Sequence, residues 1–152
     1  MKPMARTSTL AATLGALALF CSAGPAMATA ELPPVQTSGQ IEYLTGGIGT
    51  QESAALERAS KQWPLTLEFA VKDKPRADFA ADVATEIRDA GGHQVLQVTS
   101  GGPFILARLA PGTYTVDATF AGRTLHEKVR VRHGQPAKAL FLWPAGSQAP
   151  RS

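Results

Sequence analysis

Seven short stretches in which apolar and polar residues alternate, separated by turn signals, fill residues 65–143 of this 152-residue chain. In residues 65–71 (L-T-L-E-F-A-V) the alternation matches a strand with one buried face. The paired glycines of residues 90–93 (A-G-G-H) are typical of a hairpin turn. This spacing predicts a seven-stranded antiparallel β-sandwich. We expect its strands at residues 65–71, 83–89, 95–100, 104–109, 113–120, 124–132 and 137–143.

One hairpin permits a prediction of strand register. A two-residue turn at Ala121 and Gly122 would place apolar pairs on the core face and polar pairs on the solvent face. The predicted core pairs are Ala118–Leu125 and Tyr114–Val129, and the predicted solvent pairs are Asp117–His126, Thr115–Lys128 and Thr113–Arg130. Glu127 opposite Val116 does not fit, which indicates a bulge or a strand end that leaves the core.

The residues before this region predict one short helix. Good helix formers dominate residues 50–62, with Thr50 as the expected N-cap, Glu52 in the first turn and Pro64 after the end. Residues 31–40 contain two prolines and predict an extended or disordered leader. We therefore expect a leader, a glycine-rich turn and a helix over residues 31–64, a sandwich over 65–144 and a disordered tail over 145–152.

The first thirty residues have the pattern of a secretory signal peptide. A basic start at Lys2 and Arg6 precedes an apolar run over residues 10–20 and small residues suited to cleavage after Ala30 or Ala28. The apolar run is too short for a permanent transmembrane helix. A lipid anchor on Cys21 is the alternative, but Phe20 precedes it where a small residue is needed. These features predict a periplasmic or secreted protein.

Removal of residues 1–30 would leave no cysteine, so an exported chain would fold without disulfides. Loss of Lys2 and Arg6 lowers the 15 Lys and Arg residues to 13, against 12 Asp and Glu residues, for a net charge of about +1. This balance argues against general nucleic-acid binding.

A motif in the fifth predicted strand resembles a known family. Residues 109–116 (L-A-P-G-T-Y-T-V) are similar to the L-x-P-G-x-Y-x-V stretch of carboxypeptidase regulatory-like domains. The resemblance covers roughly residues 65–143 and implies a transthyretin-like (prealbumin-like) sandwich, without implying an activity. In such a corner, Tyr114 could bury its ring and hydrogen-bond a backbone group through its hydroxyl. The mature chain also resembles small secreted proteins of Gram-negative bacteria that have no established activity.

The stretch T-G-G-I-G at residues 45–49 is the first candidate site. It lacks the lysine of a phosphate loop and the spacing of a dinucleotide-binding turn. A helix N-terminus can hold an anion, but Glu52 would repel it. We interpret this stretch mainly as a flexible entry to the helix, with partner contact as the functional alternative. Its candidate partner-binding residues are Thr45, Gly46, Gly47 and Gly49.

A second candidate site is a basic stripe on the sixth predicted strand. Lys128, Arg130 and Arg132 alternate along it and would share one face. They could protect a solvated strand from edge pairing, or they could contact an anionic envelope polymer or lipid headgroup. Trp63 is a further candidate contact. Trp63 and Trp143 could instead fill the core.

The sequence contains no recognisable catalytic or metal-binding set. His93, His126 and His133 are spaced unlike zinc ligands, and there is no G-x-S-x-G elbow. We therefore predict no cofactor, no metal and no enzymatic activity. The expected function is non-catalytic binding or structural interaction with an envelope protein or polymer. The alternatives are a carbohydrate-binding module with an exposed tryptophan platform, and a hydrolase that pairs Glu52 or Asp82 with a histidine.

Overall fold

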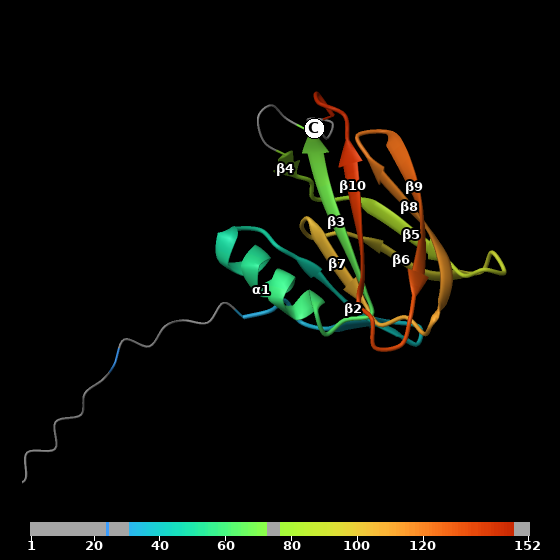
Figure 1. Cartoon of the computed structure of the whole chain (residues 1–152). Coiled ribbons are helices and arrows are strands. Elements are labelled where there is room, and N and C mark those ends of the chain that lie inside the picture. The colour runs from blue at the N-terminus through green and yellow to red at the C-terminus, as the bar shows by residue number, and fades with distance from the viewer. Residues whose placement is uncertain (1–23, 25–30, 73–76, 148–152) are drawn as a thin grey trace, which may run out of the picture.

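The computed structural model describes Gly24, residues 31–72 and residues 77–147, which form two packed β-sheets and one helix (Figure 1). Most of the predicted signal peptide and residues 148–152 of the predicted tail lie outside this description. Sheet A contains β1 (Gln36–Ser38), β2 (Ile41–Gly46), β3 (Leu65–Lys72), β4 (Ala77–Phe79), β7 (Phe104–Ala107) and β10 (Ala137–Trp143). Sheet B contains β5 (Ala84–Arg88), β6 (Gln94–Thr99), β8 (Gly112–Phe120) and β9 (Arg123–Val131).

The number of strands is ten, so the prediction of seven is wrong, although all seven predicted strands occur close to their expected bounds. The additional strands are β1, β2 and β4. Strand β2 lies inside sheet A, whose order is β1-β2-β7-β3-β10, with β4 pairing with β3. Part of the predicted leader and the first residues of the glycine-rich stretch are therefore built into the same sheet as the predicted sandwich strands.

The pairing of β3 with β10 corrects the expectation of a wholly antiparallel fold. These strands run parallel, from Ala137 beside Leu65 to Trp143 beside Val71. The other strand pairs in both sheets are antiparallel, among the residues that the structure describes. Because parallel neighbours cannot be joined by a tight turn, this pair requires a long connection, here formed by the strands between β3 and β10.

The predicted β8–β9 hairpin is confirmed pair by pair, including Val116 opposite Glu127. Ala121 and Gly122 both have positive φ angles, 51° and 75°, as a tight turn matched to strand twist requires. No bulge interrupts the register. Glu127 is exposed because the first part of β9 leaves the core, while Val129 and Val131 near its end are buried.

The main core lies between the two sheets. Inward residues of β3 and β10, including Leu67, Phe69 and Phe141, meet Ile87, Val116 and other inward residues of sheet B. Trp143 is fully buried there, and its indole N–H donates to the backbone oxygen of Arg123 at 3.0 Å. This bond satisfies the one polar atom of the indole in the core.

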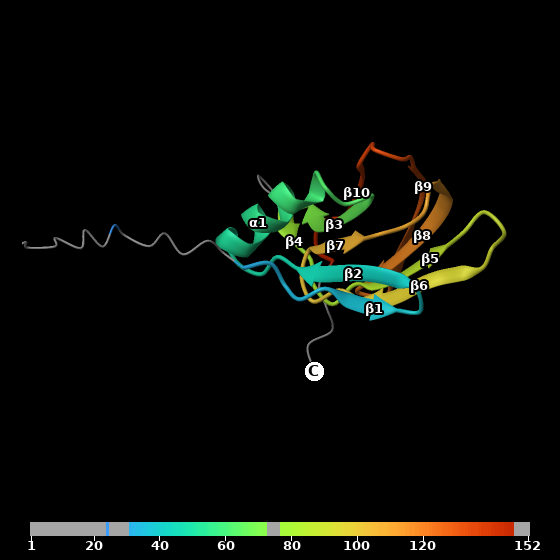
Figure 2. The ribbon, with the colours of Figure 1, turned by 90° about the horizontal axis from the view of Figure 1, so that it is seen from below.

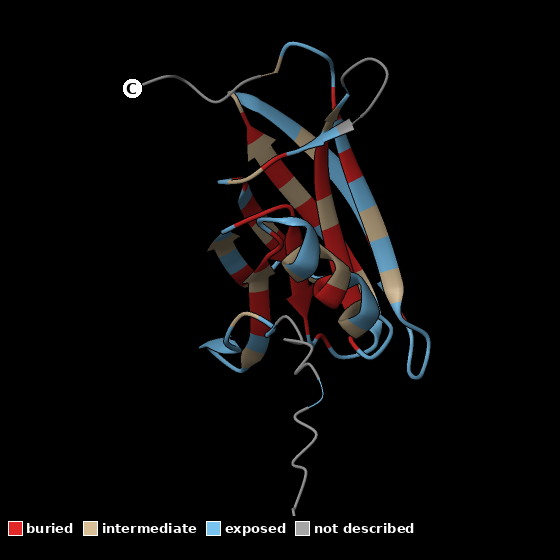
Figure 3. Cartoon of the chain, turned by 90° about the vertical axis from the view of Figure 1, so that its left-hand side faces the viewer, coloured by how far each residue is buried: buried red, intermediate tan, exposed pale blue. Residues whose placement is uncertain are grey.

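Helix α1 (Thr50–Ser60) covers the outer face of sheet A, against β2 and β7 (Figure 2). Leu56 is fully buried in a second apolar cluster with Leu44, Trp63, Phe104 and Leu106. The outward side of the helix is exposed (Figure 3). The helix therefore lies flat on the sheet as part of the scaffold.

The expected N-cap is wrong. Gly49 is the N-cap, Thr50 is the first helical residue, and no side chain caps the helix. Glu52 remains in the first turn as predicted, where its carboxylate accepts a hydrogen bond from the Gly47 backbone N–H. The side chain of Glu52 thus orders the turn that leads into the helix.

Candidate functional site

The glycine-rich stretch is held inside the fold by its own hydrogen bonds. The Thr45 hydroxyl donates to the Phe104 backbone oxygen at 2.8 Å and accepts from the Gly101 N–H at 2.9 Å. The Ser53 hydroxyl donates to the Gly47 backbone oxygen. These contacts connect the predicted site residues to the neighbouring turn at residues 101–104 and to α1.

Close packing explains a glycine on each side of the contact between this stretch and residues 101–104. A Cβ atom on Gly102 would lie 2.3 Å from the Gly46 backbone oxygen. Gly47 has a φ of 103°, and a Cβ there would lie 2.6 Å from the Phe104 ring. Gly47 and Gly102 are therefore needed for this stretch to pack against residues 101–104, which supports the structural interpretation. The carboxylate of Glu52, 2.7 Å from the Gly47 nitrogen, adds negative charge where an anion would have to bind.

The structure brings two predicted site residues, Trp63 and Arg132, into one pocket at the end of the molecule where β3 and β10 begin and β9 ends. Lys61, Arg108 and His133 also line this end pocket, and no Asp or Glu does. Three separate segments supply its cations: Lys61 follows α1, Arg108 follows β7, and Arg132 follows β9. The end pocket is thus a basic site assembled from residues distant in sequence.

Arg108 is fixed in place by two contacts. Its guanidinium carbon lies 4.1 Å from the centre of the Trp63 ring, within the range of a cation–π interaction. Its Nε lies 3.2 Å from a carboxylate oxygen of Glu42 on β2. The Arg108 side chain is nevertheless 48% exposed, and guanidinium has five N–H donors, so it retains donors for a ligand.

The walls of the end pocket are largely apolar. The cavity measures about 320 Å³. Its apolar lining residues are Trp63, Pro64, Leu109, Pro111, Val131 and Pro136. Trp63 is only 5% exposed, because Arg108 covers its ring and the second apolar cluster holds its other side. The end pocket therefore combines apolar walls with a cationic rim.

Lys128, Arg130 and Arg132 are exposed and occur at every second residue along β9 and just beyond it. Lys128 and Arg130 lie opposite Thr115 and Thr113, as predicted. Within residues 31–72 and 77–147 neither Lys128 nor Arg130 forms an ion pair. Their positive charges are therefore open to an external partner. Arg132 connects this basic stripe to the end pocket.

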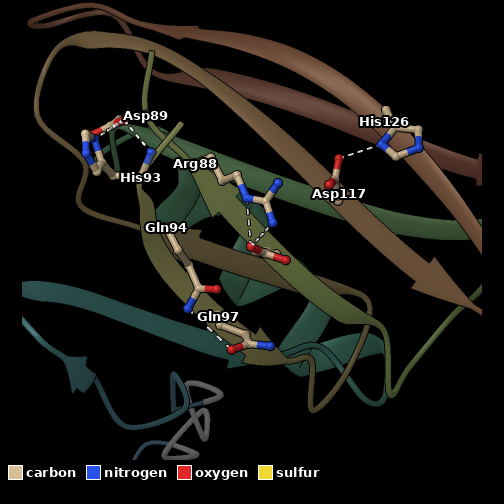
Figure 4. A network of polar contacts seen from close by, with 8 residues as sticks. Arg88, Asp89, His93, Gln94, Gln97, Asp117 and His126 are labelled. Atoms are coloured by element: carbon tan, nitrogen blue, oxygen red, sulfur yellow. Dashed lines mark hydrogen bonds and ion pairs between the residues drawn. The ribbon is translucent and has the colours of Figure 1, made fainter. Parts of the chain in front are cut away.

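Two of the histidines lie beside carboxylates (Figure 4). His126 Nδ1 is 2.5 Å from Asp117 Oδ1 on the neighbouring strand, and both lie on the outer face of sheet B. His93 is 3.3 Å from Asp89 at the hairpin turn. The backbone N–H groups of His93 and Gly91 donate to Asp89 and hold the pKa of its carboxyl below the ordinary value of 3.8.

These pairs do not form the site that the hydrolase alternative requires. Glu52 contacts Gly47, and neither Glu52 nor Asp82 pairs with a histidine among the described residues. His93 and His126 are exposed, with side-chain exposures of 82% and 67%. A histidine that activates a Ser or Thr nucleophile has to hydrogen-bond to its hydroxyl. No Ser or Thr hydroxyl in the described part of the chain bonds to either histidine.

Other classes of site receive no support from the described residues. Within residues 31–72 and 77–147, no three His, Cys, Asp or Glu side chains are placed to hold a metal ion. Both tryptophans are buried, so neither offers the exposed platform of the carbohydrate-binding alternative. No helix of the described residues is long and apolar enough to cross a membrane.

Sequence reasoning did not find Lys61, Arg108 and His133 as members of the site. Arg108 stands near the end of the otherwise apolar run F-I-L-A-R-L, which is the one local signal for it. The position of its side chain depends on β7 lying beside β2, which places Glu42 next to it. No family model matches the chain, and no curated protein has a significantly similar sequence.

Proposed function

We propose that this is a non-catalytic, exported binding protein of the bacterial periplasm or envelope, built on a carboxypeptidase regulatory-like β-sandwich. Its export rests on the signal-peptide pattern of residues 1–30, and its family on the motif at residues 109–116. Its partner is an acidic envelope protein or polymer. The recognition surface is the basic stripe of Lys128, Arg130 and Arg132 together with the end pocket.

The observation that carries this proposal is the gathering of cations at one end of the molecule. Lys61, Arg108 and Arg132 surround a cavity with no acidic lining residue, and Lys128 and Arg130 extend the positive surface along β9. The net charge of the expected mature chain is only about +1, so this concentration is local rather than a consequence of an overall basic composition. A local positive surface attracts and orients an anionic partner.

The position of α1 moves the proposed contact away from the glycine-rich turn. Because the helix is packed flat and Thr45 and Gly47 form internal hydrogen bonds, these residues support the scaffold. Ile48 is the exception, since its side chain is 65% exposed at the turn. The proposal therefore assigns partner contact to β9 and the end pocket.

Binding of purified residues 31–152 to poly-L-glutamate tests the proposal, with neutral dextran as the control polymer. We expect binding that weakens as ionic strength rises and at least a tenfold loss in the variant Lys128→Gln/Arg130→Gln. The control variant is Lys72→Gln, because Lys72 is exposed at the end of β3 in sheet A, whereas β9 belongs to sheet B and the end pocket lies where β3 begins. Absence of binding, or equal binding by both variants, contradicts the proposed surface.

Export is tested separately by cell fractionation and mass spectrometry of the full-length chain. The proposal expects a periplasmic or secreted product whose first residue is Glu31, or Thr29 for cleavage after Ala28. A product that retains residues 1–30 in the cytoplasm contradicts the export proposal, whatever the binding result.

A further inference from the structure

We propose that the end pocket receives the C-terminal carboxylate of an extended peptide whose last side chain is apolar. This inference rests on the proposed binding function and names the part of the partner that the end pocket recognises. It follows from the chemistry of the pocket, its size and its position at the end of the basic stripe.

The cations of the end pocket suit a carboxylate. Arg108 and Arg132 each present a planar guanidinium, whose parallel N–H groups match the two oxygens of a carboxylate. Arg108 is already fixed by the Trp63 ring and by Glu42, so a ligand would order few further side-chain rotations at this residue. Lys61 and His133 add donors on the same rim. No Asp or Glu lines the pocket; Glu42, outside the lining, pairs with Arg108 through Nε and leaves the other guanidinium N–H groups available.

The walls favour an apolar group beside the carboxylate, which would contact mainly Pro64, Pro111 and Pro136, because Trp63, Leu109 and Val131 are almost fully buried. Leu109, Val131 and Trp63 form part of the lining together with Pro64, Pro111 and Pro136. An inorganic anion such as phosphate would leave these walls in contact with water. A sugar acid would need an exposed aromatic face, but the Trp63 ring is covered by Arg108. A carboxylate that adjoins an aliphatic or aromatic side chain uses both the rim and the walls.

The cavity volume suits the end of a chain. About 320 Å³ is at the lower end of the range for small-molecule pockets, which favours one terminal residue. Pro111, His133 and Pro136 of the lining are exposed, which leaves an exit for the rest of the peptide.

The basic stripe fits the remainder of such a peptide. Lys128, Arg130 and Arg132 are two residues apart, a spacing of about 7 Å in a strand. An extended peptide alongside β9 repeats its side chains with the same period. Acidic residues at alternate positions before the apolar terminal residue would therefore match the cations in register.

The decisive experiment compares two peptides by calorimetry with residues 31–152. The first is N-acetyl-Glu-Ala-Glu-Ala-Glu-Leu with a free C-terminal carboxylate. The second, N-acetyl-Glu-Glu-Ala-Glu-Ala-Glu-Leu amide, has the same net charge but no terminal carboxylate. We expect the amide to bind at least tenfold more weakly. Inorganic phosphate should not displace the free-acid peptide at comparable concentration.

Two variants locate the binding site. Arg132→Gln should reduce affinity for the free-acid peptide at least tenfold and bring it close to that of the amide. Arg108→Lys keeps the positive charge but removes the parallel N–H groups of the guanidinium. It should reduce the preference for the free-acid peptide over the amide. Lys72→Gln is the control, because Lys72 is an exposed cation at the end of β3, whereas the end pocket lies where β3 begins. It should leave both affinities unchanged.

The outcomes separate this inference from the proposed function. Equal affinity for the two peptides overturns carboxylate recognition but leaves binding by the basic stripe intact. Binding of poly-L-glutamate without binding of either peptide also overturns the inference alone. If the wild-type protein binds neither the polymer nor the peptides, both the proposed function and this inference are contradicted.

Discussion

The hydroxyl of Tyr114 donates to the backbone oxygen of Ala110 at 2.6 Å, across the turn that precedes β8. The ring of Tyr114 is buried in the main core, with 8% of the residue exposed. This arrangement confirms the corner that the motif at residues 109–116 predicted. It fixes the turn at Pro111 and Gly112 against the core, next to one wall of the end pocket.

Replacement of Tyr114 with Phe keeps the ring and removes the hydrogen bond. We expect the free energy of unfolding to fall by about 0.5–1.5 kcal/mol, the usual net contribution of one such bond. Urea denaturation monitored by circular dichroism measures it. The control is Tyr43→Phe, because the Tyr43 hydroxyl donates at 3.1 Å to the exposed side chain of Gln36. Loss of that bond should lower the free energy of unfolding by less. A larger effect at Tyr43 would contradict this assignment.

Tyr114 also predicts a pH dependence. Burial, with a smaller contribution from the charge of Asp89, raises the pKa of Tyr114 above its ordinary value of 10.0. At alkaline pH the unfolded chain therefore loses this proton before the folded chain does. The contribution of Tyr114 is fully present below pH 10.0 and declines as the pH rises above that value. The difference in unfolding free energy between wild type and Tyr114→Phe should shrink over this range; a difference that grows would contradict it.

Gly102→Ala should destabilise the protein strongly. The new Cβ would meet the backbone of Gly46, which cannot move without disturbing β2. We expect a loss of about 1–3 kcal/mol or more, as for other overpacked sites. Gly101→Ala is a matched control, because its Cβ would find only the Thr45 methyl at an ordinary 3.7 Å. Equal melting temperatures for the two variants would show that the glycine-rich stretch is not held against residues 101–104.

Leu56→Ala tests whether α1 is scaffold. Leu56 is fully buried between the helix and the outer face of sheet A, so we expect a loss of about 2–5 kcal/mol. The emission of Trp63, in the same cluster, should shift to longer wavelength in a variant that also carries Trp143→Phe. Arg58→Ala on the exposed side of α1 is the control. If Leu56→Ala leaves the stability unchanged, the packing of α1 on sheet A does not stabilise the protein, and the helix would be available for contact with a partner.

Lys138 connects β10 to two other elements. Its ammonium lies 2.9 Å from Glu68 on β3 and 3.7 Å from Glu57 on α1. The hydrogen bond to Glu68 raises the pKa of Lys138 above 10.5 despite partial burial, so the stabilisation is complete below that pH and is lost above it. Because the side chain is 46% exposed, Lys138→Gln should cost less than about 1 kcal/mol at neutral pH. Added salt should reduce that difference; an increase would contradict the assignment.

The sequence predicted the strands in which side chains alternate strongly and turn residues lie close by. Strands β3, β5, β6, β7, β8, β9 and β10 were found for this reason. The short strands β1 and β4 have three residues each, and β2 contains polar residues and ends in glycine, so their pattern is weak. These strands exist because sheet A supplies partners for their backbone groups, which is information that a local pattern does not contain.

The candidate site was predictable only in part. The alternation of Lys128, Arg130 and Arg132 correctly indicated a shared, exposed face. The end pocket was not predictable. Lys61, Arg108 and Arg132 are distant in sequence, and only the folded structure brings them to one pocket. The same limit applies to the parallel pairing of β3 with β10, since the periodicity of a strand does not specify its neighbour.

The parallel pairing of β3 with β10 has a consequence for the order in which the protein can mature. Residues Leu65 to Val71 of β3 pair with residues 72 positions later, so one edge of β3 stays unpaired until β10 has been synthesised. Contacts of such long sequence separation form slowly. A chain that ends before Ala137 should therefore leave this edge of β3 without a partner and more accessible to protease than in the full-length protein.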